Sequence, residues 1–401
     1  MKQVIIIGSI YPEGLLEEIK DKCTYVDYAA DTFQKSLFIG LDKKADNISF
    51  ITYPVYRASP FKFCFRGRRE NTGFLCGKSK IIFTGLLNIP ILKKIDETRR
   101  VYNELKNLLS KKNQSYVIVY SLHSPFLIPV ILLRDKIRKT MVIIPDLPEY
   151  MGGGKGFLYK IAKAVDRFII NHCVARFDSF TLLSPYMKDH LPIKNKPAVV
   201  VEGIYSDLCL LDEDVVKSSG VNILYTGLIS QRYGVFDLIE AFARINNNDY
   251  SLWLCGVCGC MEEKALLEDY LKKDRRIKYY GSVSSKEARL LQRKASLLVN
   301  PRHSSGEFTK YSFPSKTMEY LASGTPTLMC KLPAIPEEYN DYLFYFEDES
   351  IDGYTSKIVE VASMDWSILK KKGLEGKQFI EMYKNEYVQA SKISKLLLGV
   401  E

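Results

Sequence analysis

A short segment in the second half of the sequence has the residue types of an anion-binding loop. Residues 227–234 read Gly-Leu-Ile-Ser-Gln-Arg-Tyr-Gly and lie between a predicted strand and a predicted helix. A glycine turn that opens a helix presents free backbone N–H groups to an anion, and Arg232 adds a full positive charge. The alternative is an ordinary strand-to-helix loop with a solvated arginine.

A second segment of this kind follows Pro301-Arg302. Ser312-Phe313-Pro314-Ser315 precedes a predicted helix, whose first N–H groups would face a phosphate. Lys316 in the first turn opposes the helix dipole unless an anion compensates its charge. Glu319, three residues later, shares a face with Lys316 and suits a ribose hydroxyl. A surface ion pair is the alternative for Lys316 and Glu319.

Polar side chains also follow predicted strands in the first half of the sequence. His123 comes after the strand 116–120 and could donate a proton to a substrate oxygen. Asp146 and Glu149 follow the strand 140–144, where two carboxylates could bind sugar hydroxyls or act as acid and base. The alternatives are a structural histidine and acids that cap the following turn.

Short β-rich runs alternate with helical patterns, which predicts an α/β fold with parallel sheets built from βαβ units. The predicted strands are 3–7, 48–51, 116–120, 140–144, 179–183, 198–201, 222–225, 251–254, 277–280, 297–299 and 327–329. The predicted helices are 97–110, 157–174, 235–245, 261–272, 285–294, 315–321 and 373–398. In helix 157–174, Phe157, Leu158, Ile161 and Val165 recur at helical spacing, and we expect their face to pack into the core.

Ligands of doubly wound sheets bind outside the carboxyl ends of the strands, where all the polar segments above are expected. Gly8-Ser9 follows the first strand in the same way and joins the candidate site residues. Residues 8–14 lack the G-x-G-x-x-G pattern of dinucleotide sites, so an NAD-type cofactor is not supported.

The series of strands restarts near residue 198, after the turn-rich sequence Lys194-Asn195-Lys196-Pro197. We therefore predict two doubly wound domains, residues 1–197 and residues 198–376. Residues 377–401 are predicted to form a helix that returns to the first domain.

The composition fits a soluble globular protein, since 46% of the 401 residues are hydrophobic and 26% are charged. Collagen-like and disordered chains are excluded. The net charge of +10 is unevenly divided: residues 1–200 hold 32 basic and 18 acidic residues, and residues 201–401 hold 25 and 29. A basic first half predicts an anionic partner for that half.

The basic excess is concentrated in residues 51–100, which hold 11 basic and 3 acidic residues. Lys62, Arg66, Arg68 and Arg69 alternate there with phenylalanines, a combination that could rest on an anionic bilayer. A solvated basic face is the alternative. No nucleic-acid-binding motif accompanies these residues, so nucleic acid is not a predicted partner.

The cysteines indicate a reducing, cytoplasmic setting. Their number, 9, is odd, and the apolar run near the first residue is too short for a secretory signal. Cys255, Cys258 and Cys260 resemble half of a zinc site, but no second pair of Cys or His lies near them in the sequence. Small residues in a strand-end turn are the favoured interpretation, and no metal is expected.

At residues 301–326 the sequence resembles the retaining nucleotide-sugar glycosyltransferases of family 4, in the branch that assembles capsule and exopolysaccharide. Residues 225–234 are similar to the phosphate loop of that family. Trp253-Leu-Cys-Gly256 is similar to its strand-then-glycine element, and Tyr280-Gly-Ser-Val283 to the segment that contacts the base. The resemblance implies the GT-B fold, in which two Rossmann-like doubly wound domains face each other.

The resemblance also implies roles for residues. The second domain would bind a nucleotide-diphosphate sugar, and the first domain would bind the acceptor. The implied donor-site residues are Gly227, Arg232, Gly256, Val283, Arg302, Glu307, Tyr311, Ser312, Phe313, Pro314, Ser315, Lys316 and Glu319. The implied acceptor-side residues are Gly8, Ser9, His123, Asp146 and Glu149. Catalysis would fall to His123 and Asp146, and to Arg232 and Lys316, which would stabilise the leaving diphosphate.

Two positions depart from the pattern of the family. The first acid of its Glu-x7-Glu signature falls on Tyr311, and Glu307 could substitute for it from four residues earlier. The usual Gly-Arg before the phosphate loop is Gly227-Leu228, so one cation is missing.

The resemblance predicts a metal-independent, retaining hexosyltransferase without a cofactor. It would transfer a sugar to a saccharide acceptor, lipid-linked, in surface polysaccharide synthesis, at the cytoplasmic face of the plasma membrane. One alternative is a nucleotide-sugar 2-epimerase-like isomerase, which would release free nucleotide sugar without an acceptor. The other is a non-catalytic partner protein of a polysaccharide assembly complex.

Overall fold

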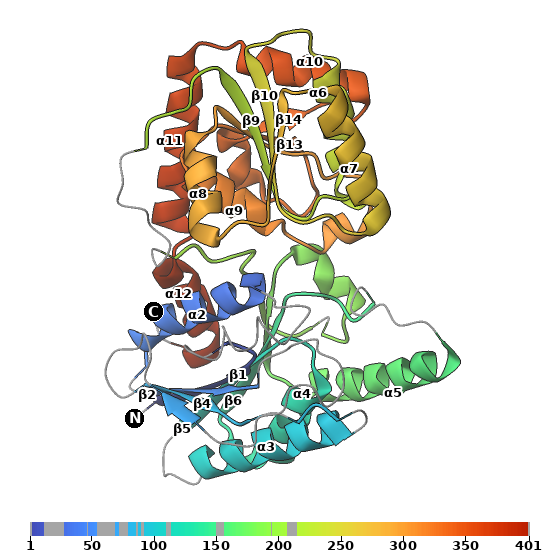
Figure 1. Ribbon diagram of the computed structural model, residues 1–401. Coiled ribbons are helices and arrows are strands. Elements are labelled where there is room, and N and C mark those ends of the chain that lie inside the picture. Colours follow the sequence, from blue (N-terminus) through green and yellow to red (C-terminus); the bar gives the residue numbers. More distant parts are fainter. Residues whose placement is uncertain are drawn as a thin grey trace. The chain divides into compact units, whose positions relative to one another are not determined.

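The chain forms two compact units, each with its own sheet and with helices on both faces of that sheet (Figure 1). The first unit comprises Met1–Ile204 and Glu386–Glu401, and the second comprises Tyr205–Asn385. The computed structural model describes residues 2–11, 28–45, 47–53, 69–71, 79–85, 87–89, 92–109, 114–149, 156–193, 195–206 and 215–399.

The sheet of the first unit has the strand order β3-β4-β2-β1-β5-β6-β7-β8. Its strands are β1 Lys2–Gly8, β2 Asn47–Thr52, β3 Arg69–Asn71, β4 Lys80–Phe83, β5 Gln114–Tyr120, β6 Lys139–Ile144, β7 Ser179–Leu182 and β8 Ala198–Val200. Among the described strands of this sheet, β3 alone runs antiparallel to its neighbour. Strands of a parallel sheet are buried on both faces, which explains the continuous apolar run Val4–Ile7 in β1.

Helices α2 (Tyr28–Asp42) and α12 (Glu386–Leu398) cover one face of this sheet (Figure 1). Helices α3 (Leu92–Leu109), α4 (Ser124–Leu132) and α5 (Phe157–Val174) lie on the other. The short 3-10 helices are η1 Arg134–Lys136 and η2 Pro185–His190. Ala390 and Ile393 of α12 are buried against Phe38 and Ile118, so the end of the chain completes the first core.

The sheet of the second unit is parallel, with the strand order β11-β10-β9-β12-β13-β14. Its strands are β9 Val221–Thr226, β10 Tyr250–Cys255, β11 Ile277–Gly281, β12 Leu297–Asn300, β13 Thr327–Cys330 and β14 Phe344–Phe346. Its helices are α6 Val235–Ala243, α7 Met261–Lys273, α8 Ser285–Lys294, α9 Ser315–Ala322, α10 Ile351–Ala362 and α11 Trp366–Tyr383. Its 3-10 helices are η4 Gln231–Tyr233, η5 Glu307–Lys310 and η6 Glu337–Tyr342.

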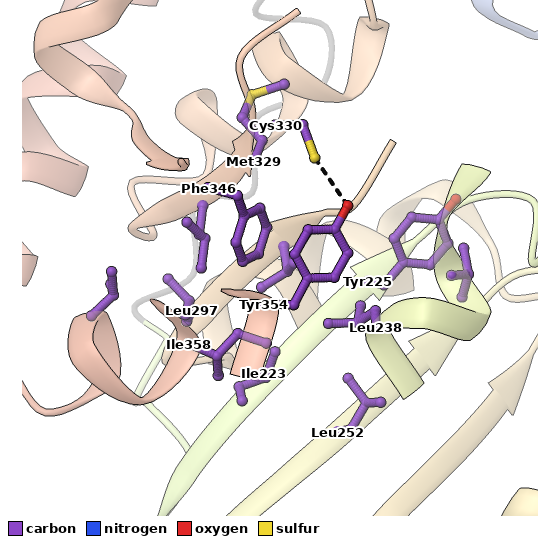
Figure 2. Close-up of a cluster of buried hydrophobic side chains, with 14 of the residues drawn as sticks. Ile223, Tyr225, Leu238, Leu252, Leu297, Met329, Cys330, Phe346, Tyr354 and Ile358 are labelled. Carbon is purple, nitrogen blue, oxygen red and sulfur yellow. Dashed lines mark hydrogen bonds between the residues drawn. The ribbon is translucent and has the colours of Figure 1, made fainter. Parts of the chain in front are cut away.

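The core of the second unit is built where α6 and α10 pack on the sheet. Figure 2 shows Ile223 of β9, Leu238 of α6 and Tyr354 of α10 in one buried cluster. The Tyr354 hydroxyl lies 3.2 Å from the Cys330 sulfur, so its polar atom has a partner inside the core (Figure 2). Burial and this partner fix α10 at the carboxyl edge of β13.

The predicted fold class, two doubly wound parallel sheets, is confirmed. The strand predicted at 198–201 is β8, which pairs with β7 in the first sheet, although we expected it to open the second domain at residue 198. The two units divide after Ile204 and again after Asn385, rather than at residues 197 and 376. The predicted tail helix is two helices, since the backbone leaves helical geometry at Lys384 (φ −122°, ψ 9°), where the Asn385 side chain donates to the Glu381 carbonyl.

The expectation that the apolar face of α5 packs into the core is wrong. Phe157, Ile161 and Val165 are exposed, and only the last turns of α5 bury apolar side chains, among them Ile170 and Val174. The reason is that α3 and α4 already cover that face of the sheet, so most of α5 lies beyond it.

The substitution Ile393→Ala tests whether α12 stabilises the first unit. Ile393 is fully buried, so the lost methyl groups and the cavity should cost the first unit about 2–5 kcal/mol. Hydrogen exchange measured by mass spectrometry should show faster exchange in β1 and unchanged exchange in β9. Lys370→Ala, on an exposed position of α11, is the control and should change neither strand. Equal acceleration in both units, or in neither, would contradict this role of α12.

Candidate functional site

Two glycine turns meet at the carboxyl edge of the second sheet. Gly227 follows β9 with φ 149°, and its N–H donates to the Cys255 carbonyl at 2.9 Å. Gly256 follows β10 with φ 147°, and its N–H donates to the Gly281 carbonyl at 2.8 Å. A Cβ atom on Gly256 would lie 1.7 Å from the Gly227 carbonyl oxygen. The two turns can therefore lie this close only because residue 256 is glycine.

A third glycine joins the predicted anion loop to the end of β12. Gly234 has the left-handed φ of 69°, and a Cβ there would lie 2.1 Å from the Pro301 carbonyl oxygen. Helix α6 begins directly after Gly234, with Asp237 in its first turn. The loop 227–234 thus ends at a helix start that is held against Pro301-Arg302.

Two arginines lie against one aromatic ring at this edge. The guanidinium carbons of Arg232 and Arg302 are 4.8 Å and 4.6 Å from the centroid of the Phe308 ring. Arg232 is exposed, and among the described residues no carboxylate forms an ion pair with it. Each cation is held at this edge by its contact with the ring, and the exposed Arg232 can reach an anion there.

Helix α9 is fixed to the end of β9 by a buried tyrosine. The Thr226 N–H donates to the Tyr320 hydroxyl at 2.9 Å, and Tyr320 is fully buried. Lys316 lies one turn earlier, on the same side of α9. Burial raises the pKa of the Cys255 thiol, and the nearby Lys316 charge acts against that rise. The first turn of α9 therefore places its ammonium beside the end of β10.

Lys316 and Glu319 form an ion pair in which Nζ lies 2.7 Å from the carboxylate oxygen. Their side chains are 32% and 44% exposed, so both remain accessible to a ligand. Burial alone would lower the pKa of Lys316, but the Glu319 carboxylate outweighs that effect and the pKa is raised. Lys316 consequently stays positively charged at neutral pH.

The other predicted donor-site residues differ in exposure. Glu307 in η5 and Ser315 are exposed, and Ser312 and Val283 are half-buried. Tyr311, Phe313 and Pro314 are buried. Of the two residues proposed for the missing first acid, Glu307 is thus the one that reaches solvent.

His303, which the sequence reasoning missed, lies next to this edge between two acids. Its Nε2 is 2.6 Å from Asp237 of α6, and its Nδ1 is 3.4 Å from Glu349. The Tyr354 hydroxyl is 3.3 Å from the same Nδ1. The sequence could indicate His303 only by its place next to Arg302, because the two acids come from distant parts of the sequence.

In the first unit, Gly8 and Ser9 lie against α2. The Ser9 N–H donates to the Gln34 side chain at 2.9 Å, and a Cβ on Gly8 would lie 2.1 Å from the same oxygen. The Tyr11 N–H donates to Asp31 at 2.8 Å. The N–H groups of Ser9 and Tyr11 are therefore occupied by side chains of the protein itself.

The segment after β5 carries a strained residue and the predicted histidine. Ser121 has φ 77°, the left-handed region that non-glycine residues seldom adopt. His123 follows, and its Nε2 lies 3.0 Å from Glu97 of α3, whose side chain is only 2% exposed. The buried carboxylate fixes the orientation of the ring.

The other residues predicted on the acceptor side are exposed, and most of those predicted on the membrane are not described. Asp146 and Glu149 are exposed after β6, and Glu149 pairs with Arg167 of α5 at 2.5 Å. Lys62, Arg66 and Arg68 lie outside the described residues, and Arg69 is the first residue of β3. Within the described ranges, no three His, Cys, Asp or Glu side chains gather as a metal site would require.

Comparison with known proteins agrees with this geometry. Residues 220–363 match the sequence model of a family described as glycosyl transferases group 1. No match to the chain is found among curated proteins. Residues 220–363 of the second unit are therefore a group 1 glycosyltransferase domain, and the chain shares the GT-B type of fold.

Three solved structures illustrate the shared fold. Sucrose-phosphate synthase from Thermosynechococcus elongatus is 14% identical, with a TM-score of 0.66 over 99% of this chain and 98% of that one. HepE from Anabaena, solved with UDP, is 11% identical, with a TM-score of 0.62 over 100% of both chains. The lipopolysaccharide outer core galactosyltransferase WaaB is 13% identical, with a TM-score of 0.59 over 100% and 99%.

Gly256→Ala tests whether the meeting of the two glycine turns forms a nucleotide site. The new methyl group must displace the Gly227 turn, so we expect affinity for a nucleotide-diphosphate sugar to fall about tenfold or more. Isothermal titration calorimetry would measure this loss.

Gly220→Ala is the matched control, because Gly220 also has a positive φ, 75°, but precedes β9 at the opposite edge of the sheet. Both variants bear a conformational cost of about 1–3 kcal/mol. Similar nucleotide affinities in the two variants would contradict the site.

Proposed function

We propose that the protein is a glycosyltransferase that transfers a sugar from a nucleotide-diphosphate sugar to a lipid-linked saccharide, with retention of configuration, in surface polysaccharide synthesis. The cation pair on the Phe308 ring carries the donor half of this proposal. Arg232 and Arg302 stand at the carboxyl edge of β9 and β12, where doubly wound sheets bind their ligands. That edge also lies inside the matched segment 220–363.

The donor would lie across the three glycine turns. Its diphosphate would bind Arg232, Lys316 and the first N–H groups of α9, which opens without a side-chain cap. Glu319, exposed beside Lys316, would accept hydrogen bonds from the ribose hydroxyls. Val283 would lie near the base.

The same cations would act in the chemical step. As the bond between the sugar and the diphosphate breaks, negative charge develops on the departing oxygen, and positive groups already in place stabilise it. A front-face attack would let that oxygen take the proton of the acceptor hydroxyl, so no protein nucleophile is required. We propose that the side-chain cations make the transfer independent of a metal ion.

The acceptor would bind the first unit near His123, Asp146 and Glu149. His123 is held by the buried Glu97 and could donate to or polarise an acceptor hydroxyl. The basic charge of residues 1–200 supports an acceptor at an anionic membrane, at its cytoplasmic face. None of the described helices combines the length and apolar character needed to cross a bilayer. The fold shared with a lipopolysaccharide core galactosyltransferase is consistent with a saccharide acceptor.

Arg232→Ala should weaken donor binding because a charge-assisted contact to the diphosphate is lost. Such contacts contribute about 1.5–3 kcal/mol, so we expect the dissociation constant to rise about tenfold to a hundredfold. The control is Arg275→Ala, an exposed arginine before β11 at the opposite edge of the sheet. Calorimetric titration should detect the loss in the first variant alone, and an equal loss in both would argue against the assigned contact.

A donor screen tests the activity itself. Thermal shift with UDP-, GDP- and TDP-sugars should identify one nucleotide class that stabilises the protein by mass action. With that donor, product analysis should show sugar transfer that depends on a saccharide acceptor. An epimerised nucleotide sugar formed without an acceptor would instead establish the isomerase, and no stabilisation by any donor would favour a non-catalytic protein.

A further inference from the structure

Helix α5 presents an apolar side that the core of the first unit does not use. Phe157 and Phe168 are 76% and 73% exposed, and Ile161 and Val165 are about half exposed, at 46% and 55%. Their spacing of four, four and three residues places all of them on one side of the helix. Figure 1 shows α5 extending beyond the other helices on its face of the sheet. An exposed row of large apolar side chains marks an interaction surface.

The first turn of α3 lies beside α5 and carries exposed apolar side chains of its own. Lys94 of α3 lies 2.8 Å from Asp166 of α5, which brings the two helices together. Leu92 and Ile95, on either side of Lys94, are exposed as well. The docking face is defined here as Leu92, Ile95, Phe157, Ile161, Val165 and Phe168.

Positive charge surrounds the docking face. Lys160 is exposed on one flank of the apolar row of α5, Arg99 is exposed one turn after Ile95, and Arg167 beside Lys160 pairs with Glu149. Asp166 accepts hydrogen bonds from Lys94 and from Ser124, so its charge is already compensated. An apolar row bordered by cations complements a lipid bilayer with anionic headgroups.

We propose that the docking face seats the first unit on an anionic lipid bilayer, with its apolar side chains inserted among the acyl chains near the headgroups. The inference rests on the proposed function, because a lipid-linked acceptor requires an enzyme that works at a membrane. The membrane contacts predicted at Lys62, Arg66, Arg68 and Arg69 would add to this surface.

The docking face is joined to the acceptor-side residues by short contacts. Glu97 of α3 lies 3.0 Å from His123, and Asp166 of α5 lies 2.5 Å from Ser124, the next residue of the chain. A bilayer under α3 and α5 would therefore lie close to the site where the acceptor is expected. The same two helices would bind the membrane and orient His123.

Vesicle flotation with the full chain tests the proposal. The wild type should float with vesicles of phosphatidylglycerol and phosphatidylcholine, and much less with phosphatidylcholine alone. The double variant Phe157→Ser, Phe168→Ser should bind the anionic vesicles at least about tenfold more weakly, given the transfer free energy of each ring. The matched control is Met261→Ser, Ile368→Ser, which removes two exposed apolar side chains from the second unit and should bind like the wild type.

Donor affinity is measured on every variant in parallel. Unchanged affinity in the double variant shows that the protein is folded and that the loss belongs to the membrane. If the wild type does not float but binds the donor, the docking proposal is overturned while the proposed donor chemistry stands. Equal flotation of wild type and double variant, or a wild-type dimer that the double variant converts to monomer, would also overturn it.

A tryptophan placed on the docking face gives an independent readout. Both native tryptophans, Trp253 and Trp366, lie in the second unit. Phe157→Trp should add fluorescence that brominated phosphatidylcholine in anionic vesicles quenches. Tyr186→Trp, at an exposed site in η2 of the same unit, should add fluorescence that is not quenched. Equal quenching at the two sites would contradict insertion of α5.

Discussion

The backbone contact between the turns after β9 and β10 is the constraint on which the donor-binding edge depends. With a Cβ at Gly256 only 1.7 Å from the Gly227 carbonyl, these turns can adjoin only as bare backbone. Their approach keeps the ends of the two strands level, so that Thr226 reaches Tyr320 and fixes α9. Cations from separate segments are thereby collected at one edge without a continuous sequence motif.

In the first unit, charged side chains hold neighbouring helices together. Asp166 is partly buried, which would raise its pKa, but hydrogen bonds from Lys94 and Ser124 lower the pKa further than burial raises it. The ionised carboxylate thus ties α5 to α3 and to the start of α4. Because His123 precedes Ser124 and pairs with Glu97, the position of the histidine depends on the same three helices.

The sequence was sufficient for the elements whose pattern is local. The apolar runs of β1, β5 and β9 and the capped helix α8 were predicted within a residue or two of their bounds. The apolar run 116–133 reads as a strand, a loop and the start of a helix, and α4 begins there with Pro125 in its first turn, where its missing N–H costs nothing. Tertiary contacts could not be predicted from the sequence, for a different reason. The acids around His303 and the free side of α5 depend on what packs nearby, which residue spacing does not encode.

The position of α12 also affects how the protein is made. Residues 1–204 leave the ribosome without the helix that covers one face of their sheet, since that helix is formed by Glu386–Leu398. The second unit, by contrast, is continuous in sequence and is complete before α12 emerges. Synthesis therefore reverses the usual N-terminal-first order of domain completion. The apolar face formed by Phe38 and Ile118 therefore stays uncovered until α12 has been synthesised.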